Sequence, residues 1–205
     1  MVTRLPNPEG KGEVSMLDLL VNSLRMRPDR IIVGEIRRKR EAEVLFEAIH
    51  TGHSVYATVH ANDTQETITR LTNPPIDIPK TMLPAISMIV VQYRNRRTGI
   101  RRTFQISEIL PDSNPNVLIQ LDIRKDTLKK ISNSKSLLTT IELFTGYTRN
   151  EINKSLNEKE LILKWMAKNN INTVNTVGRV MAEYYTNKDN LIANMRKKKT
   201  MGDEK

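Results

Sequence analysis

The stretch from Arg30 to Asp63 constrains the fold of this chain more than any other part of the sequence. Its apolar run 31–33 is too short for a helix and is typical of a strand that is covered on both faces. Residues 41–50 carry apolar side chains on one helical face, and Gly52 suits the left-handed position that follows a helix. A second apolar run then predicts a strand over 55–59. Strand, helix and strand in this order indicate a parallel sheet, in which ligands bind at the carboxyl ends of the strands.

The segments around this stretch are predicted from their breakers and capping residues. Residues 1–14 contain two prolines and two glycines and predict an extended loop. A helix is predicted over 15–26, because Ser15 opens an S-x-x-[DE] capping pattern. Asp63 and Pro79 are each expected to begin a further short helix.

The second half of the chain changes from strands to helices. Strands are predicted at 88–93, 100–110 and 117–121. The polar and apolar alternation within 100–110 favours antiparallel pairing, so we expect these strands to extend the parallel pair into one mixed sheet. Helices are predicted from about residue 126, and the polar segment 196–205 is expected to be frayed. The predicted fold class is therefore α/β, with a core over 1–125 and a helical C-terminal region over 126–205.

Composition and charge exclude few classes of function. The 205 residues include no cysteine, which excludes disulfides and thiolate metal sites and is compatible with a reducing cytosol. No apolar run approaches the roughly 18 residues of a membrane span, and the N-terminus has no apolar signal region. The formal net charge of +10 fits nucleic-acid binding, contact with an anionic membrane, or a solvated basic surface. The spread of the basic residues and the 4% aromatic content favour the solvated surface.

Glu35 directly follows the first predicted strand and is the strongest candidate for chemistry. A carboxylate in this place can orient a water molecule for attack on a phosphate, or hold Mg²⁺ through water. The residues alone favour equally a surface glutamate that pairs with nearby arginines. The cations Arg38, Lys39 and Arg40 are unfavourable at a helix N-terminus, which indicates an acidic neighbour.

The three histidines of the chain are His50, His53 and His60. His50 and His53 have i, i+3 spacing, but Gly52 interrupts the helix between them and no acidic or thiol ligand has a matching spacing. We therefore predict no metal site there, and interpret His50 as a helix-surface residue. His60 follows the second predicted strand, and so is expected at the same edge as Glu35. Polar residues at this strand end that can support the site are Thr58, Asn62 and Asp63.

Two motifs in the stretch resemble the secretion-motor ATPases, the superfamily of type II and type IV secretion, type IV pilus and archaellum motors. The segment IIVGEIR, 31–37, is similar to their Walker B segment, and TGHSVYATVHAND, 51–63, is similar to their two-histidine box. The segment LRMRPDRIIVGEIR, 24–37, together with the segment NPPIDIP, 73–79, most resembles the archaeal and tight-adherence branch of this superfamily. The resemblance runs from about Asn7 to Glu108. It implies the second half of a RecA-like P-loop NTPase core followed by a helical region.

The resemblance also implies roles for individual residues. Glu35 takes the place of the catalytic glutamate, and Arg37 that of an arginine that stabilises phosphate charge or braces Glu35. His53 and His60 are expected to face the γ-phosphate. The implied ligands are ATP and Mg²⁺. The implied partners are further copies in a homo-hexamer, or a missing N-terminal half, and an integral-membrane platform protein of a secretion or pilus machine.

One element of that superfamily is missing from the sequence. None of the eight glycines begins or closes a G-x-x-x-x-G-K-[ST] motif, and the EGKG at 9–12 lacks its spacing. The loop that cradles the phosphates, and the hydroxyl that binds Mg²⁺, are thus absent from these 205 residues. We expect the chain to be the C-terminal part of a motor ATPase that does not hydrolyse ATP alone, located in the cytoplasm at the inner face of the membrane.

Two alternatives remain open from the sequence. The chain can instead be a non-enzymatic assembly or regulatory subunit that docks on complete motor ATPases. Nucleic-acid binding through the basic surface is the less favoured alternative. Arginines at 94, 96, 97, 101 and 102 flank a predicted hairpin turn, where they either contact an anionic partner or protect an edge strand.

Overall fold

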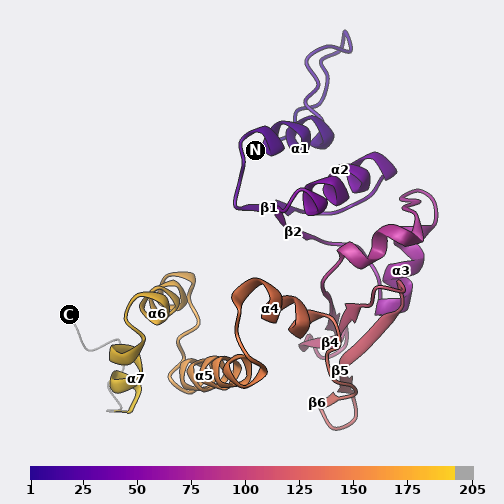
Figure 1. Cartoon of the computed structure of the whole chain (residues 1–205). Coiled ribbons are helices and arrows are strands. Elements are labelled where there is room, and N and C mark those ends of the chain that lie inside the picture. The colour runs from indigo at the N-terminus through magenta and orange to yellow at the C-terminus, as the bar shows by residue number, and fades with distance from the viewer. Residues whose placement is uncertain (197–205) are drawn as a thin grey trace. The chain divides into compact units, whose positions relative to one another are not determined.

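The computed structural model describes residues 1–196 and divides the chain into two compact units, Met1–Thr140 and Ile141–Lys205 (Figure 1). The polar segment 196–205, predicted to be frayed, lies outside the described residues apart from the backbone of Arg196. The elements of the first unit are α1 (Met16–Arg25), β1 (Arg30–Val33), α2 (Lys39–His50), β2 (Ser54–Ala57), α3 (Thr64–Thr72), η1 (Lys80–Ala85), β3 (Ile89–Arg94), β4 (Arg101–Ile109), β5 (Pro115–Asp122) and β6 (Thr127–Lys130). Helix α4 (Leu137–Thr145) spans the division, and α5 (Arg149–Lys168), α6 (Val174–Thr186) and α7 (Lys188–Arg196) follow.

The helix starts follow the capping residues that the sequence predicts. The Ser15 side chain accepts a hydrogen bond from the Asp18 backbone, and the Asp18 carboxylate accepts one from the Ser15 backbone. Gly52 has φ +92°, as expected for a residue that follows a helix end. Helix α2 begins two residues earlier than predicted, at Lys39. The Lys39 ammonium lies 2.8 Å from the carboxylate of Asp77, the acidic neighbour that its position indicated.

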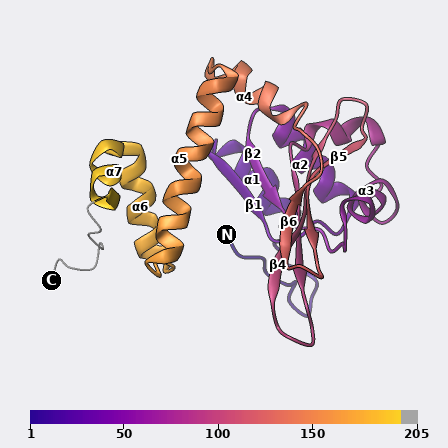
Figure 2. The same cartoon turned by 90° about the horizontal axis from the view of Figure 1, so that it is seen from below.

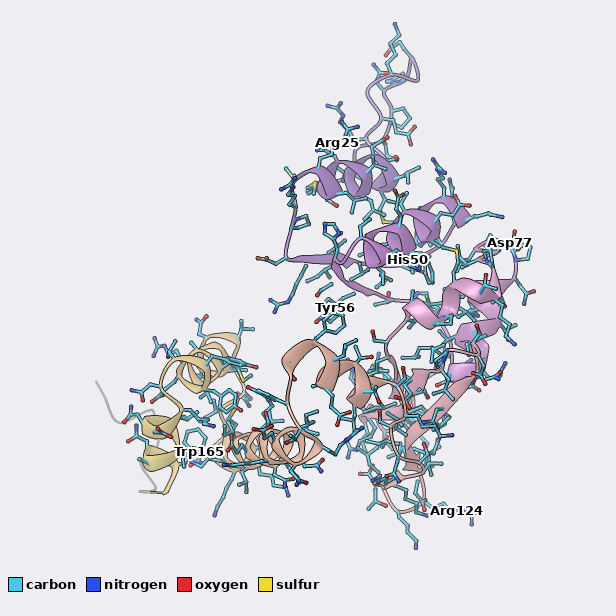
Figure 3. The ribbon with its side chains drawn as sticks, in the orientation of Figure 1. Arg25, His50, Tyr56, Asp77, Arg124 and Trp165 are labelled. Atoms are coloured by element: carbon cyan, nitrogen blue, oxygen red, sulfur yellow. The ribbon has the colours of Figure 1, made fainter. Side chains whose placement is uncertain are left out.

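Strands β1 and β2 form a two-stranded parallel sheet, and helices cover one of its faces. Ile31 and Val33 belong to the main core together with apolar residues of α1 and α2, which lie side by side in Figure 1. Ile32 is 78% exposed and Tyr56, its register partner, is 57% exposed. Figure 3 shows Tyr56 pointing away from α2. The prediction of a strand covered on both faces is therefore wrong for the first unit, in which no element packs on the second face.

The remaining strands form a separate antiparallel sheet in the order β3-β4-β5-β6. The α/β class is confirmed, but the parallel and antiparallel strands do not share one mixed sheet. The prediction of helix from residue 126 is also wrong, because β6 occupies Thr127–Lys130 and α4 begins at Leu137. The division into a core over 1–125 and a helical region over 126–205 stays a prediction about domains; the compact units divide after Thr140.

A fully buried carboxylate fixes the segment that leads from this sheet into α4. Glu108 of β4 accepts hydrogen bonds from the backbone N–H groups of Lys135, Ser136 and Leu137. The side chains of Asn116 and Ser134 donate to the same carboxylate. Burial raises the pKa of Glu108, but these donors outweigh burial and lower the pKa to about 2. The carboxylate is therefore ionised and fully satisfied at neutral pH.

The second unit has a small core of its own. Its buried residues come from α5, α6 and α7 and are Ile162, Met166, Val180, Tyr184 and Leu191. Thr148 and Glu151 form a capping box at the start of α5. Among residues 1–196, no helix combines the length and the apolar character needed to cross a membrane.

Candidate functional site

Glu35 is held at the carboxyl ends of β1 and β2 by a residue of the neighbouring strand. The backbone N–H of Ile36 donates to the Thr58 carbonyl at 3.0 Å, which extends the parallel pairing past the last strand residues. The Thr58 hydroxyl donates to the Gly34 carbonyl. Thr58 thus binds the residues on both sides of Glu35.

The Glu35 carboxylate meets two of the residues that the sequence selected. Arg37 donates to Glu35 Oε2, with its Nε and Nη2 atoms each 2.6 Å from that oxygen. The His60 Nε2 atom lies 3.4 Å from the other oxygen, Oε1. The hydrogen bond from Arg37 lowers the pKa of Glu35, burial opposes this, and the charges of Arg37 and His60 lower it further. The same pairing raises the pKa of Arg37.

These contacts determine what Glu35 can do chemically. A carboxylate whose pKa is lowered is ionised at neutral pH and is a weak base. Arg37 occupies Oε2 with two 2.6 Å contacts, whereas His60 approaches Oε1 at 3.4 Å, so Oε1 is the oxygen better placed to accept a hydrogen bond from a water molecule. Glu35 in this arrangement is better suited to orienting water than to removing its proton.

An open groove of about 550 Å³ lies beside this cluster and is called the Glu35 groove below. Its lining residues are Glu35, Ile36, Arg37, Val59, His60, Glu66, Thr69, Arg70, Asn73, Pro74, Pro75 and Ile76. Residues of α3 and of the following turn therefore face the strand ends. The groove has three cationic or ionisable donors, Arg37, His60 and Arg70, and is of a size that admits phosphate groups.

The groove contains residues that the sequence analysis did not select. One of them is Glu66, whose Oε2 accepts 2.8 Å hydrogen bonds from the backbone and side-chain nitrogens of Asn62. These bonds, with one from Arg70, lower the pKa of Glu66. Arg70 donates to Glu66 Oε1 at 3.0 Å. The i, i+4 spacing of Glu66 and Arg70 was a signal for this pair.

The remaining predicted residues fall into two groups. Asn62 and Asp63 organise the start of α3, where the Asp63 carboxylate accepts from the Glu66 backbone at 2.7 Å. His53 precedes β2, whereas His60 follows it, so a strand rise of roughly 13 Å separates them. The His53 Nδ1 atom lies near the Ala48 carbonyl and the Thr51 hydroxyl, at the end of α2. The structure therefore brings His60 to Glu35 and leaves His53 at the opposite end of β2.

The described residues contain no group of three His, Cys, Asp or Glu side chains that could hold a metal ion. The interpretation of His50 agrees with its position, since its Nδ1 atom is 2.7 Å from the Phe46 carbonyl within α2.

Comparison with known proteins decides the family. The sequence profile described as type II/IV secretion system protein matches residues 1–136. The chain belongs to this family. The resemblance to secretion-motor ATPases is thereby confirmed.

Relatives of the chain include archaeal and bacterial members of the family. An uncharacterized protein of Methanocaldococcus jannaschii is 37% identical over 163 residues, which are 76% of this chain and 60% of the relative. The type IV pilus assembly ATPase PilB of Acinetobacter baylyi is 37% identical over 50% of this chain and 18% of its own length. A putative conjugal transfer protein of Mycobacterium tuberculosis is 47% identical over 35% of this chain and 20% of its own length. The chain thus spans less than two thirds of each relative.

Proposed function

We propose that this type II/IV secretion family chain supplies the water-orienting and phosphate-contacting groups of a secretion or pilus motor ATPase. Glu35 orients the attacking water through Oε1. Arg37 and His60 contact oxygens of the γ-phosphate, where negative charge is present throughout the reaction. One observation carries the proposal. Glu35 contacts both Arg37 and His60 at the carboxyl ends of two parallel strands, beside an open groove.

The residues present fit part of a nucleotide site. Phosphate oxygens accept hydrogen bonds, and the Glu35 groove presents the donors Arg37, His60 and Arg70. For Mg²⁺ the fit is limited to a water-mediated contact with Glu35, because Mg²⁺ prefers carboxylate and water oxygens and the described residues form no ligand cluster. When bound, Mg²⁺ would neutralise phosphate charge. Glu35 would hold water beside it, and Arg37 would keep the carboxylate oriented.

The phosphate cradle is proposed to come from protein outside these 205 residues, because the sequence contains no G-x-x-x-x-G-K-[ST] motif. We propose assembly into a hexamer at the cytoplasmic face of the membrane, in contact with an integral-membrane platform protein. The phosphate contact of His53 stays a prediction. It would belong to a surface other than the Glu35 groove, since His53 lies at the opposite end of β2.

Phosphate release from Mg-ATP tests this function. The purified chain alone is expected to release phosphate at the background rate. Mixed with the motif-bearing segment of a family member, it is expected to support hydrolysis, and Glu35→Gln should lower the rate about 10²- to 10⁴-fold. Glu43→Gln is the matched control, since within residues 1–196 Glu43 forms its ion pair with Arg40, on the surface of α2. Hydrolysis by the chain alone, or an unchanged rate with Glu35→Gln, contradicts the proposal.

A second candidate function is that of a non-enzymatic assembly or regulatory subunit. The exposed pair Ile32 and Tyr56 favours it, because an apolar sheet face is suited to contact with another protein. In this case, adding the chain to a complete motor ATPase changes its rate or its assembly state. Glu35→Gln then leaves that effect intact, whereas Ile32→Ser weakens it.

A further inference from the structure

We propose that the outer end of the four-stranded sheet binds the surface of an anionic lipid bilayer. This surface, called the basic sheet end, consists of residues 94–102 and 122–130. It holds the turn between β3 and β4 and the turn between β5 and β6. The inference rests on the membrane location in the proposed function, but it uses no residue of the Glu35 groove, so the two can fail separately.

The topology places both turns at the same end of the sheet. In a meander of four antiparallel strands, the first and third turns lie together and the second lies at the other end. The Arg102 Nη2 atom is 2.6 Å from Asp126 Oδ2, which joins the start of β4 to the second of these turns. Figure 2 shows the β3–β4 hairpin projecting from the first unit, and Figure 3 shows Arg124 at the outer end of the sheet.

The basic residues were interpreted from the sequence as spread out, but at the basic sheet end the fold brings together two segments that carry most of the net charge of the chain. These segments contain nine Arg and Lys residues against two Asp residues, a net charge of +7 within a chain of net charge +10. Within residues 1–196, ion pairs engage Arg102 with Asp126 and Lys129 with Asp122. The cations that form no ion pair there are Arg94, Arg96, Arg97, Arg101, Arg124, Lys125 and Lys130.

Each turn combines these cations with an exposed aliphatic side chain. Ile100, between Arg97 and Arg101, is 44% exposed, and Ile123, beside Arg124, is 56% exposed. Leu128 of β6 is 54% exposed at the same sheet end. Basic residues that surround apolar side chains suit an anionic membrane, where the cations meet headgroups and the apolar groups enter the boundary with the acyl chains.

Other partners fit these residues less well. Protection of an edge strand accounts for lysines on β6, but it does not require isoleucines in the turns. Single-stranded nucleic acid is bound by aromatic side chains that stack on bases, and residues 94–102 and 122–130 contain no aromatic residue. The bilayer is therefore the partner whose chemistry matches both the charged and the apolar groups.

Co-sedimentation of the full 205-residue chain with lipid vesicles tests the proposal. Binding is expected to vesicles that contain about 30% phosphatidylglycerol and not to pure phosphatidylcholine, and to weaken as salt is raised. The double substitution Arg97→Gln and Arg124→Gln should lower the affinity roughly 25-fold, at about five-fold per charge. The matched control, Lys154→Gln with Lys168→Gln, removes the same charge from exposed positions on α5 and should leave binding within about two-fold.

A second pair of substitutions distinguishes a bilayer from other anionic partners. Ile100→Ser with Ile123→Ser should weaken vesicle binding several-fold without changing its dependence on salt, because no charge is lost. Circular dichroism checks that each variant is folded. Equal binding to neutral vesicles, an equal loss in the α5 control, no effect of the isoleucine substitutions, or tighter binding to DNA or an acidic protein than to anionic vesicles would each overturn the proposal.

Discussion

Thr58 controls the position of Glu35 through two hydrogen bonds. Its carbonyl accepts from Ile36 and its hydroxyl donates to Gly34, so the residues on both sides of Glu35 are fixed to the end of β2. The carboxylate itself then depends on Arg37 and His60. The cluster of Glu35, Arg37 and His60 is therefore built by contacts between the ends of two neighbouring strands.

The titration of Glu35 can be predicted from these contacts. Arg37→Gln should raise the pKa of Glu35, because the side-chain hydrogen bond from Arg37 is the largest cause of its lowering. His60→Gln should raise it by less, because His60 contributes only through its charge. Nuclear magnetic resonance of the Glu35 carboxyl carbon as a function of pH measures both changes. A larger change with His60→Gln than with Arg37→Gln contradicts the prediction.

Glu108 is the residue whose removal should cost the most stability in the second sheet. Glu108→Gln places an amide among five donors that now bind a carboxylate, and should lower the free energy of unfolding by about 2–3 kcal/mol. Urea denaturation measures this loss. Glu9→Gln, at an exposed position, is the control and should change the free energy of unfolding by less than about 0.5 kcal/mol.

The pH dependence of this loss follows from the lowered pKa of Glu108. A carboxyl whose pKa is about 2 when folded, against an ordinary value of 4.5, stabilises the fold above the unfolded pKa. That stability is lost as the pH falls from about 4.5 to about 2. The difference between the original chain and Glu108→Gln should therefore be constant near neutral pH and shrink through this range. A difference that grows on acidification would show that Glu108 is not held as an anion.

At the scale of secondary structure, adjacent residues of β1 lie on opposite faces of the β1–β2 sheet, one buried and one exposed. Ile31 is 5% exposed within the core, and Ile32 is 78% exposed on the uncovered face. Ile31→Ala should lower the free energy of unfolding by about 2–5 kcal/mol, whereas Ile32→Ala should change it by less than about 0.5 kcal/mol. Thermal and urea unfolding compare the two variants. Equal losses would mean that the second face is covered in solution.

The sequence predicted the elements better than their arrangement. Helix starts at Ser15, Asp63 and Thr148 were predictable, because caps are local interactions within one turn. The exposure of Ile32 was not predictable, because an apolar residue in a strand does not indicate whether another element covers its side chain. Strand β6 was missed because the residues of Thr127–Lys130 are all exposed and carry no apolar alternation. Its pairing with β5 is determined by the preceding turn and by backbone hydrogen bonds.

The same limits apply to the candidate site. Glu35 and His60 were predictable as partners because parallel strands bring their carboxyl ends to one edge. The presence of Arg70 and Glu66 in the Glu35 groove could not be predicted from the sequence. It depends on the packing of α3 against the strand ends. His53 shows the opposite case. The strand predicted over 55–59 already separates His53 from His60, and the expectation that both face one phosphate came from the resemblance alone.

At the scale of the whole molecule, the two compact units have separate cores. The first core is centred on residues such as Leu45, Ile78 and Leu83, and the second on residues of α5, α6 and α7 such as Leu191. The second unit is small, and small units bury less of their surface on folding. We therefore expect the two units to unfold in separate transitions, with the second unit less stable.

Matched leucine substitutions in the full chain test this expectation. Leu83 is fully buried in the first core and Leu191 is 1% exposed in the second. Leu→Ala at either position should lower the local free energy of unfolding by about 2–5 kcal/mol, because each leaves a cavity in a packed core. Hydrogen exchange resolved by residue should show lost protection within 1–140 for Leu83→Ala and within 141–196 for Leu191→Ala. If either substitution lowered the protection from hydrogen exchange in both units, the chain would unfold as one cooperative body. Two units that unfold separately would each lose protection only when their own core is changed.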